Sequence, residues 1–219
     1  MPSTTSAEER DHVARQPSTA AGRRLIVVDA FIDLVLEGGT APTPEEVADR
    51  AGVSRATFFR YFSTLVELRG EAAARVVERF PELFTIPAVG AGSLDERIRH
   101  FVDARFQLHE TLHPLELLMR SHAVRDAGTA DFVDAVRQLH ADQARQHFEA
   151  DLQSHGPARR DDMVTAIAVV TSVESWQQFR RTYDRSPVQT CRAWRMALAG
   201  IFAGASASIG VNSGERHAP

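Results

Sequence analysis

The sequence predicts an all-α protein, and three observations support this prediction. Apolar residues recur at helical spacing along most of the chain. Capping residues and helix-ending Gly and Pro residues fall between these apolar segments. No segment shows the alternation of apolar and polar residues that is typical of a half-buried strand. With 219 residues, the chain is long enough for one large helical domain or for two smaller ones.

The first predicted helix begins at Arg23 and reads "RRLIVVDAFIDLVLEGG". Its acids Asp29, Asp33 and Glu37 are four residues apart and form one narrow polar stripe on an otherwise apolar surface. Such a helix must be covered by protein on most sides, and the Gly-Gly pair after it favours termination. Residues 1–19 lack both periodicity and an apolar signal segment, so we expect a disordered N-terminal arm there.

The stretch "TPEEVADRAGVSRATFFRYF", residues 43–62, has the pattern of two short helices joined by a tight corner. Thr43 is a favourable N-cap residue, and the proline and two acids after it suit the first turn of a helix. Gly52 is expected to supply the positive φ that ends this helix, and Ser54 to cap the next one. We therefore predict a helix-turn-helix at residues 43–62.

The second helix of this motif has two distinct faces. Phe58 and Phe62, four residues apart, are expected to point inward. No acid occurs between Ser54 and Val66, although residues 1–62 as a whole hold nine acids and seven arginines. The helix is therefore locally suited to a phosphate backbone. Its outer face is predicted to carry Arg55 with Phe59 and Ala56 with Arg60, flanked by Thr57 and Tyr61.

The remaining chain is also predicted to be helical. Pro114 is expected to interrupt the helix that Ser93 caps, because proline cannot continue the hydrogen-bond pattern. The other helices are expected at residues 64–80, 129–154, 159–184 and 188–210, before a disordered tail at 212–219.

The last two predicted helices are apolar over more than one face, and the final one carries a stripe of small residues, namely Ala193, Ala197, Gly200 and Gly204. Small residues allow two helices to approach closely. Burial within one chain is one explanation of this surface. We favour the other, in which the two helices contribute to a four-helix bundle in a homodimer.

Composition excludes several functions. The chain has no lysine, so a Walker A motif, a Schiff-base lysine and a Ser-Lys dyad are absent, and phosphate contacts must come from arginine, hydroxyls or backbone amides. Cys191 is the only cysteine, which excludes an internal disulfide and is compatible with a reducing cytoplasm. No apolar run is long enough for a membrane span. We expect a cytoplasmic protein without a membrane segment.

Enzymatic chemistry has no complete motif. "HETLHP" places Glu110 and His113 at the spacing of half a di-iron carboxylate site, but no second Glu-x-x-His is present. Such histidines are more often surface or pocket-lining residues. We expect no catalytic residue, no metal and no cofactor.

The helix-turn-helix resembles the DNA-binding domain of the TetR family of bacterial transcriptional repressors. The residues that carry the resemblance are Thr43, Val47, Ala48, Ala51, Gly52, Val53, Ser54, Thr57, Tyr61, Phe62 and Leu68. The resemblance implies a three-helix DNA-binding domain at residues 20–80, with the motif at 43–62, and a larger helical domain for ligand binding and dimerisation at 81–211.

The resemblance also implies roles for individual residues. The second helix of the motif would enter the major groove, where Arg55 and Arg60 would contact base edges and Ala56 a thymine methyl. Phosphate contacts and register would come from Thr43, Thr57 and Tyr61, and Ser54 would also belong to the DNA-binding surface. Additional phosphate or minor-groove contacts would come from Arg23, Arg24, Arg10 and Arg15, for which a solvated tail is the alternative. Two positions depart from the family, which commonly has tyrosine at Phe59 and lysine at Leu65, so Phe59 would face DNA without a phosphate anchor.

By the same resemblance, the protein would bind a pseudo-palindromic DNA operator as a homodimer. The larger domain would bind an apolar or aromatic small molecule, and this binding would release the homodimer from the operator. Candidate ligand-contacting residues are Phe101, Phe106, Met119, Phe132, Trp176 and Phe179, with His109 and His140 as polar ones; ordinary core packing is the alternative for each. Two alternative functions remain: an architectural or cell-cycle DNA-binding protein of the same fold without a ligand, and a helical metal-dependent enzyme.

Overall fold

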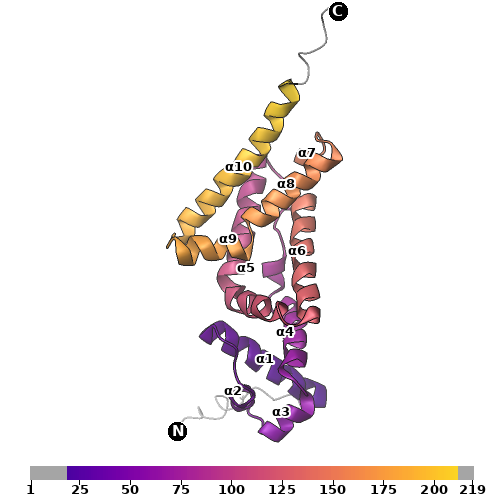
Figure 1. Ribbon diagram of the computed structural model, residues 1–219, viewed down its shortest axis with the longest axis vertical. Coiled ribbons are helices and arrows are strands. Elements are labelled where there is room, and N and C mark those ends of the chain that lie inside the picture. The colour runs from indigo at the N-terminus through magenta and orange to yellow at the C-terminus, as the bar shows by residue number, and fades with distance from the viewer. Residues whose placement is uncertain (1–18, 212–219) are drawn as a thin grey trace, which may run out of the picture. The chain divides into compact units, whose positions relative to one another are not determined.

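The computed structural model describes residues 19–211, and side chains for residues 19–204. The secondary structure of this part of the chain consists of helices, which confirms the predicted fold class (Figure 1). The chain divides into two compact units, one formed by residues 1–34 and 42–75 and the other by residues 35–41 and 76–219. The predicted arm at residues 1–19, apart from residue 19, and the predicted tail at 212–219 lie outside the described residues.

The first unit contains the N-terminal helices. They are α1 (Ala20–Gly38), of which residues 20–34 belong to this unit, α2 (Pro44–Arg50), α3 (Arg55–Tyr61) and α4 (Leu65–Arg79), of which residues 65–75 belong to it. Buried apolar side chains come from all four helices and from the residue after α3, and include Val27, Val28, Phe31, Val47, Phe58, Phe62 and Leu68. The predicted polar stripe of α1 is used in part for an ion pair, since Arg75 of α4 donates to Asp29 at 2.9 and 3.0 Å.

The second unit is a larger helical assembly in which α5 (Leu94–Ala123) packs against α6 (Ala127–His147) and α10 (Pro187–Val211). Its shorter elements are η1 (Pro81–Phe84), α7 (Glu149–Leu152), α8 (Pro157–Val170), α9 (Val173–Gln177) and η2 (Gln178–Thr182). Aromatic and aliphatic side chains from α5, α8 and α10 fill its core, among them Phe101, Phe106, Ile167, Trp194 and Leu198. None of the helices in the described part of the chain is both long and apolar enough to span a membrane.

The predicted interruption at Pro114 is wrong, because α5 continues through the proline to Ala123. A proline inside a helix costs about 3 kcal/mol. On either side of it, however, Leu112 is 2 % exposed and Leu115 is 6 % exposed, and burying one leucine contributes about 1.5–3 kcal/mol. Tertiary packing therefore keeps the helix continuous.

The helix predicted at 159–184 is divided in the structure. Thr171 leaves the helical conformation after α8, and its hydroxyl donates to the carbonyl of Ile167 at 2.8 Å. Ser172 then caps α9, because its hydroxyl accepts from the amide of Ser175 at 3.2 Å. The predicted helix at 129–154 is similarly divided at Phe148. In the first case, Ser and Thr offered the backbone alternative hydrogen bonds that hydrophobic periodicity does not reveal.

Candidate nucleic-acid interface

The first helix of the motif begins with a reciprocal cap. The Thr43 hydroxyl accepts from the Glu46 amide at 3.2 Å, and the Glu46 carboxylate accepts from the Thr43 amide at 2.7 Å. Hydrogen bonds from the Thr43 backbone and hydroxyl lower the pKa of Glu46. Two of the free amides at the start of the helix are thereby satisfied, and Val47 and Ala48 are held in the core.

A glycine and a serine form the corner between the two helices. Gly52 has φ +65°, a left-handed conformation that other residues adopt only with strain. The Ser54 hydroxyl then accepts from the Thr57 amide at 3.1 Å and lies 2.9 Å from the Thr57 hydroxyl. These contacts set the start and direction of α3, and they confirm both the Gly52 and the Ser54 predictions.

The two faces of α3 are as the sequence predicts. Phe58 and Phe62 are fully buried, and their rings pack against each other at 6.0 Å. Phe59 is 44 % exposed, and its ring meets that of Phe58 edge-on at 5.2 Å. Arg55, Ala56 and Arg60 are exposed, while Thr57 and Tyr61 are half-buried. Packed aromatic side chains therefore support α3 from within, and its outer face is short and positively charged.

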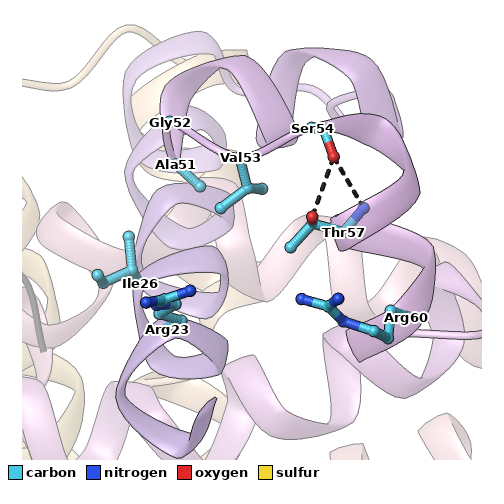
Figure 2. A pocket seen from close by; sticks show the side chains of 8 residues that line it. All are labelled: Arg23, Ile26, Ala51, Gly52, Val53, Ser54, Thr57 and Arg60. Atoms are coloured by element: carbon cyan, nitrogen blue, oxygen red, sulfur yellow. Dashed lines mark hydrogen bonds between the residues drawn. The ribbon is translucent and has the colours of Figure 1, made fainter. Parts of the chain in front are cut away.

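Two arginines from separate helices converge on a hollow beside α3. This hollow has a volume of about 230 Å³ and is lined by α1, the glycine corner and the side of α3. Figure 2 shows the guanidinium groups of Arg23 and Arg60 directed toward one another across it, with the Ser54–Thr57 hydroxyl pair nearby. Neither arginine forms an ion pair with a carboxylate among the described residues. The hollow thus collects positive charge and hydroxyl groups without a local anion.

Arg55, the other exposed arginine of α3, has an acidic partner. Its Nε lies 3.0 Å from the Glu45 carboxylate of α2, with the two side chains 68 % and 49 % exposed. The guanidinium also lies 5.6 Å from the centre of the Phe59 ring. An ion pair as exposed as this one contributes little to stability, so its partner is readily exchanged.

Arg24 occupies a different environment from Arg23. Its Nε donates to the Glu71 carboxylate at 2.9 and 3.0 Å, its Nη2 to Glu67 at 2.7 Å, and its Nη1 to the carbonyl of Tyr61. The guanidinium lies 4.2 Å from the centre of the Phe62 ring. Hydrogen bonds from Glu71 and Glu67 raise the pKa of Arg24. We call this set of contacts the Arg24 clasp.

The sequence alone could have shown that Arg24 and Arg23 have different environments. The residues three, four and seven positions after Arg24 are Val27, Val28 and Phe31, which are all buried, so Arg24 lies on the inward side of α1. The sequence predicts Arg23 only as an additional DNA contact, and it does not predict the hollow that Arg23 shares with Arg60. That hollow depends on how α1 packs against α3, which is a tertiary feature.

The candidate ligand-contacting residues lie in the second unit. Most are buried there: Phe101, His109, Met119, Trp176 and Phe106 are at most 8 % exposed, whereas Phe132 is 37 % exposed. The structure brings His109 and His140 together, with ring centres 6.1 Å apart. Trp176 belongs to the same buried cluster as Phe101 and Phe106, where its indole donates to Glu110 at 3.0 Å and stacks on His113. The sequence missed Arg105, a buried arginine near the two histidines.

The comparisons with known proteins agree with this geometry. Residues 28–72 match the family described as "Bacterial regulatory proteins, tetR family". The HTH-type transcriptional repressor KstR of Mycobacterium tuberculosis is 31 % identical over 120 residues, which cover 53 % of this chain and 54 % of that protein. KstR of Mycolicibacterium smegmatis is also 31 % identical over 120 residues, covering 53 % and 58 %. The match with this chain thus spans about half the length of these relatives.

The solved structures support the fold over a longer part of the chain. A tetR-family transcriptional regulator from Streptomyces coelicolor is similar with a TM-score of 0.67 and 22 % sequence identity, covering 87 % of this chain and 84 % of that one. The likeness therefore includes helices beyond the helix-turn-helix.

Proposed function

Because the chain belongs to the tetR family of bacterial regulatory proteins, we propose that it is a transcriptional repressor that binds a pseudo-palindromic DNA operator as a homodimer. A small-molecule effector held in the second unit would release it. The observation that carries the DNA-binding part is the outer face of α3, where exposed arginines and hydroxyl groups surround a hollow without a carboxylate.

In this proposal, the hollow beside α3 receives a DNA phosphate. Arg23 and Arg60 would donate to the phosphate oxygens, and the Thr57 hydroxyl lies on the same wall. Phosphate contacts fix the position of a protein on the duplex, and each one neutralised releases counterions. A phosphate-binding site of this kind would compensate for the absence of the two phosphate contacts that the family commonly makes at the positions of Phe59 and Leu65.

Base contacts are assigned to the N-terminal part of α3. Arg55 and Ala56 lie in its first turn and are exposed, as expected for residues that reach base edges in the major groove. The Arg55–Glu45 ion pair would be exchanged for a guanine, whose O6 and N7 accept two hydrogen bonds from arginine. The Arg24 clasp would act indirectly, because it links α1 to the end of α3 and to α4.

Support for the homodimer comes from the last helices. Val169 of α8 is 63 % exposed and Met196 of α10 is 73 % exposed, so each of these helices presents a large apolar side chain on its surface. Ala197, Gly200 and Gly204 of the small-residue stripe are also exposed. A face of this composition allows a second copy to approach closely. A homodimer would place two copies of α3 about 34–36 Å apart on successive major grooves.

Selection of genomic DNA fragments by the purified protein tests the DNA-binding part. The wild type, Arg60→Ala and the control Arg125→Ala are compared at two salt concentrations; Arg125 is an exposed arginine of the second unit, so the change in net charge is the same. We expect a pseudo-palindrome to be enriched by the wild type and the control, and Arg60→Ala to bind it with a salt dependence flatter by about 0.9 in log–log slope.

Two outcomes count against the proposal. Equal enrichment by all three proteins would exclude the hollow from DNA binding. Enrichment spread over many unrelated sequences, without a palindrome, would instead favour the architectural function.

A further inference from the structure

A buried arginine in the second unit forms no hydrogen bond to a carboxylate among the described residues. This residue, Arg105 of α5, is 1 % exposed, and its Nη2 donates to Gln143 Oε1 at 2.6 Å and to the His140 carbonyl at 3.4 Å. Its guanidinium lies 5.0 Å from the centre of the Phe101 ring. Its Nε has no hydrogen-bond partner among the described residues.

Such an arrangement is costly for the free protein. A buried charge is normally paired, because removing it from water costs far more than a neutral hydrogen bond returns. Burial lowers the pKa of Arg105 to about 10, which still leaves the group charged at neutral pH. The guanidinium therefore keeps a positive charge in the interior, together with an Nε–H group that has no partner among the described residues.

The nearest acid is already engaged. Both carboxylate oxygens of Glu116 lie 2.9 Å from Nδ1 of His109, and Nε2 of the same ring lies 3.0 Å from the Thr171 carbonyl. Glu116 therefore acts on Arg105 only at a distance, where its charge favours the charged form of the guanidinium. No hydrogen bond joins the two side chains in the described part of the chain.

A second unused polar group lies beside Arg105. The Nε2 atom of His140 is buried and has no hydrogen-bond partner in the described part of the chain. Burial, and then the charges of Arg105 and His109, lower the pKa of His140 to about 2. The ring is therefore neutral at physiological pH and can donate one hydrogen bond without adding charge.

We propose that Arg105 and His140 bind the carboxylate of the effector, and that the effector is a monoanion with an apolar body. This inference rests on the proposed function, because it specifies the ligand of the same regulator. A buried guanidinium without a carboxylate contact matches one carboxylate, and the Nε and Nη2 atoms of arginine form the side-on pair that binds a carboxylate through two hydrogen bonds. Next to the cluster, Trp194 lies 6.4 Å from the rings of both His109 and Phe106, which offers an apolar surface for the body.

Gln143 connects this site to the start of the second unit. While its Oε1 accepts from Arg105, its Nε2 donates to the carbonyl of Phe84 at 2.8 Å. Phe84 ends η1, the short helix that follows α4 in the chain. A carboxylate at Nε and Nη2 would compete with Gln143 for Arg105. Binding would therefore alter a hydrogen bond that holds the segment directly after the DNA-binding unit.

The test uses thermal melting and isothermal titration calorimetry on the full-length protein. The probes are decanoate and 4-phenylbutyrate, each paired with its uncharged primary amide. We expect each carboxylate to bind the wild type at least about tenfold more tightly than its amide, because hydrogen bonds to charged groups are stronger than neutral ones. Arg99→Met removes an exposed arginine of the same helix and serves as the matched control.

Two variants address the site itself. Arg105→Met removes the buried charge at similar volume, and a cooperative melting transition is expected because apolar replacements of buried charges are tolerated. Gln143→Glu is isosteric and places a carboxylate of the chain on Arg105, so its melting temperature should rise. Both variants are expected to lose the preference for carboxylate over amide, whereas Arg99→Met keeps it.

The proposal is overturned if carboxylates and amides stabilise the wild type equally, if neither carboxylate binds, or if Gln143→Glu responds like the wild type. Operator binding by the wild type and Arg99→Met is measured in parallel. Binding of carboxylate without binding of DNA would refute the regulatory function and leave this site standing. DNA binding without a response to carboxylate would refute this site alone.

Discussion

Although Arg24 and Arg23 are adjacent, replacing each of them by glutamine should affect different properties. Arg24→Gln should lower the stability of the protein, whereas Arg23→Gln should reduce the salt dependence of operator binding. Arg24 is 30 % exposed and its partners Glu67 and Glu71 are about 40 % exposed, so the two ion pairs contribute only about 1 kcal/mol together. The contact with the Phe62 ring contributes about 0.5–1 kcal/mol. The hydrogen bond to the Tyr61 carbonyl contributes about as much again.

Arg24→Gln should therefore destabilise the protein by roughly 2–3 kcal/mol, with a melting temperature lower by roughly 5–10 °C for a chain of this size. Differential scanning calorimetry measures the change. Operator affinity, determined by fluorescence anisotropy well below the melting transition, should fall mainly because α3 is less firmly held. The slope of log K against log salt should stay close to that of the wild type, because no phosphate contact is lost.

Arg23→Gln should give the reverse pattern. Arg23 is exposed and has no carboxylate partner among the described residues, so the melting temperature should change by less than about 1 °C. Its operator affinity should fall together with a reduction of about 0.9 in the salt slope. The reasoning is refuted if Arg24→Gln keeps the wild-type melting temperature and loses the salt slope, because Arg24 would then be the phosphate contact that the family resemblance implies.

Three further predictions concern other parts of the chain. Gly52→Ala should lower stability by roughly 1–2 kcal/mol in calorimetry, because φ +65° strains any residue with a Cβ even though open space surrounds this one; an unchanged melting temperature would mean that the corner adapts. Between pH 6.5 and 5.5 the unfolded chain takes up a proton at His140 that the folded chain, with the pKa of His140 lowered to about 2, does not bind. Stability should therefore fall by about 1 kcal/mol as the pH drops, and His140→Gln should flatten this loss in thermal melts. Met196→Glu should leave the fold intact, because the side chain is 73 % exposed, and shift the protein to a monomer in light scattering; a persistent dimer would exclude this face of α10 as the interface.

Local signals in the sequence were sufficient for the helix-turn-helix. Thr43 and Ser54 act through hydrogen bonds to amides three residues away, and Gly52 acts through its own φ. The inward side of α3 follows from the spacing of Phe58 and Phe62. Each of these features is encoded within a few residues, which explains why they could be predicted from the sequence.

Features that depend on packing between distant segments could not be predicted in this way. Pro114 is a local signal for a helix end, and it was overridden by buried leucines on both sides. Arg105 shares the inward side of its helix with Phe101 and Val102, so helical spacing indicates that it is buried but does not identify its partner. Its burial results from the packing of α5 against α6, where Gln143 meets it.

The absence of lysine makes the unpaired arginines informative. A lysine in an apolar interior can lose its proton and become neutral, whereas arginine stays charged in nearly any environment. In this chain every basic side chain apart from histidine is an arginine, so a positive charge that meets no internal acid must be neutralised from outside or remain costly. The charges of Arg23 and Arg60 are solvated by water, since both residues are exposed, and in the proposed complex they would be neutralised by DNA phosphates. Arg105 is withdrawn from water, and a small anion that enters the second unit is the partner that its environment requires.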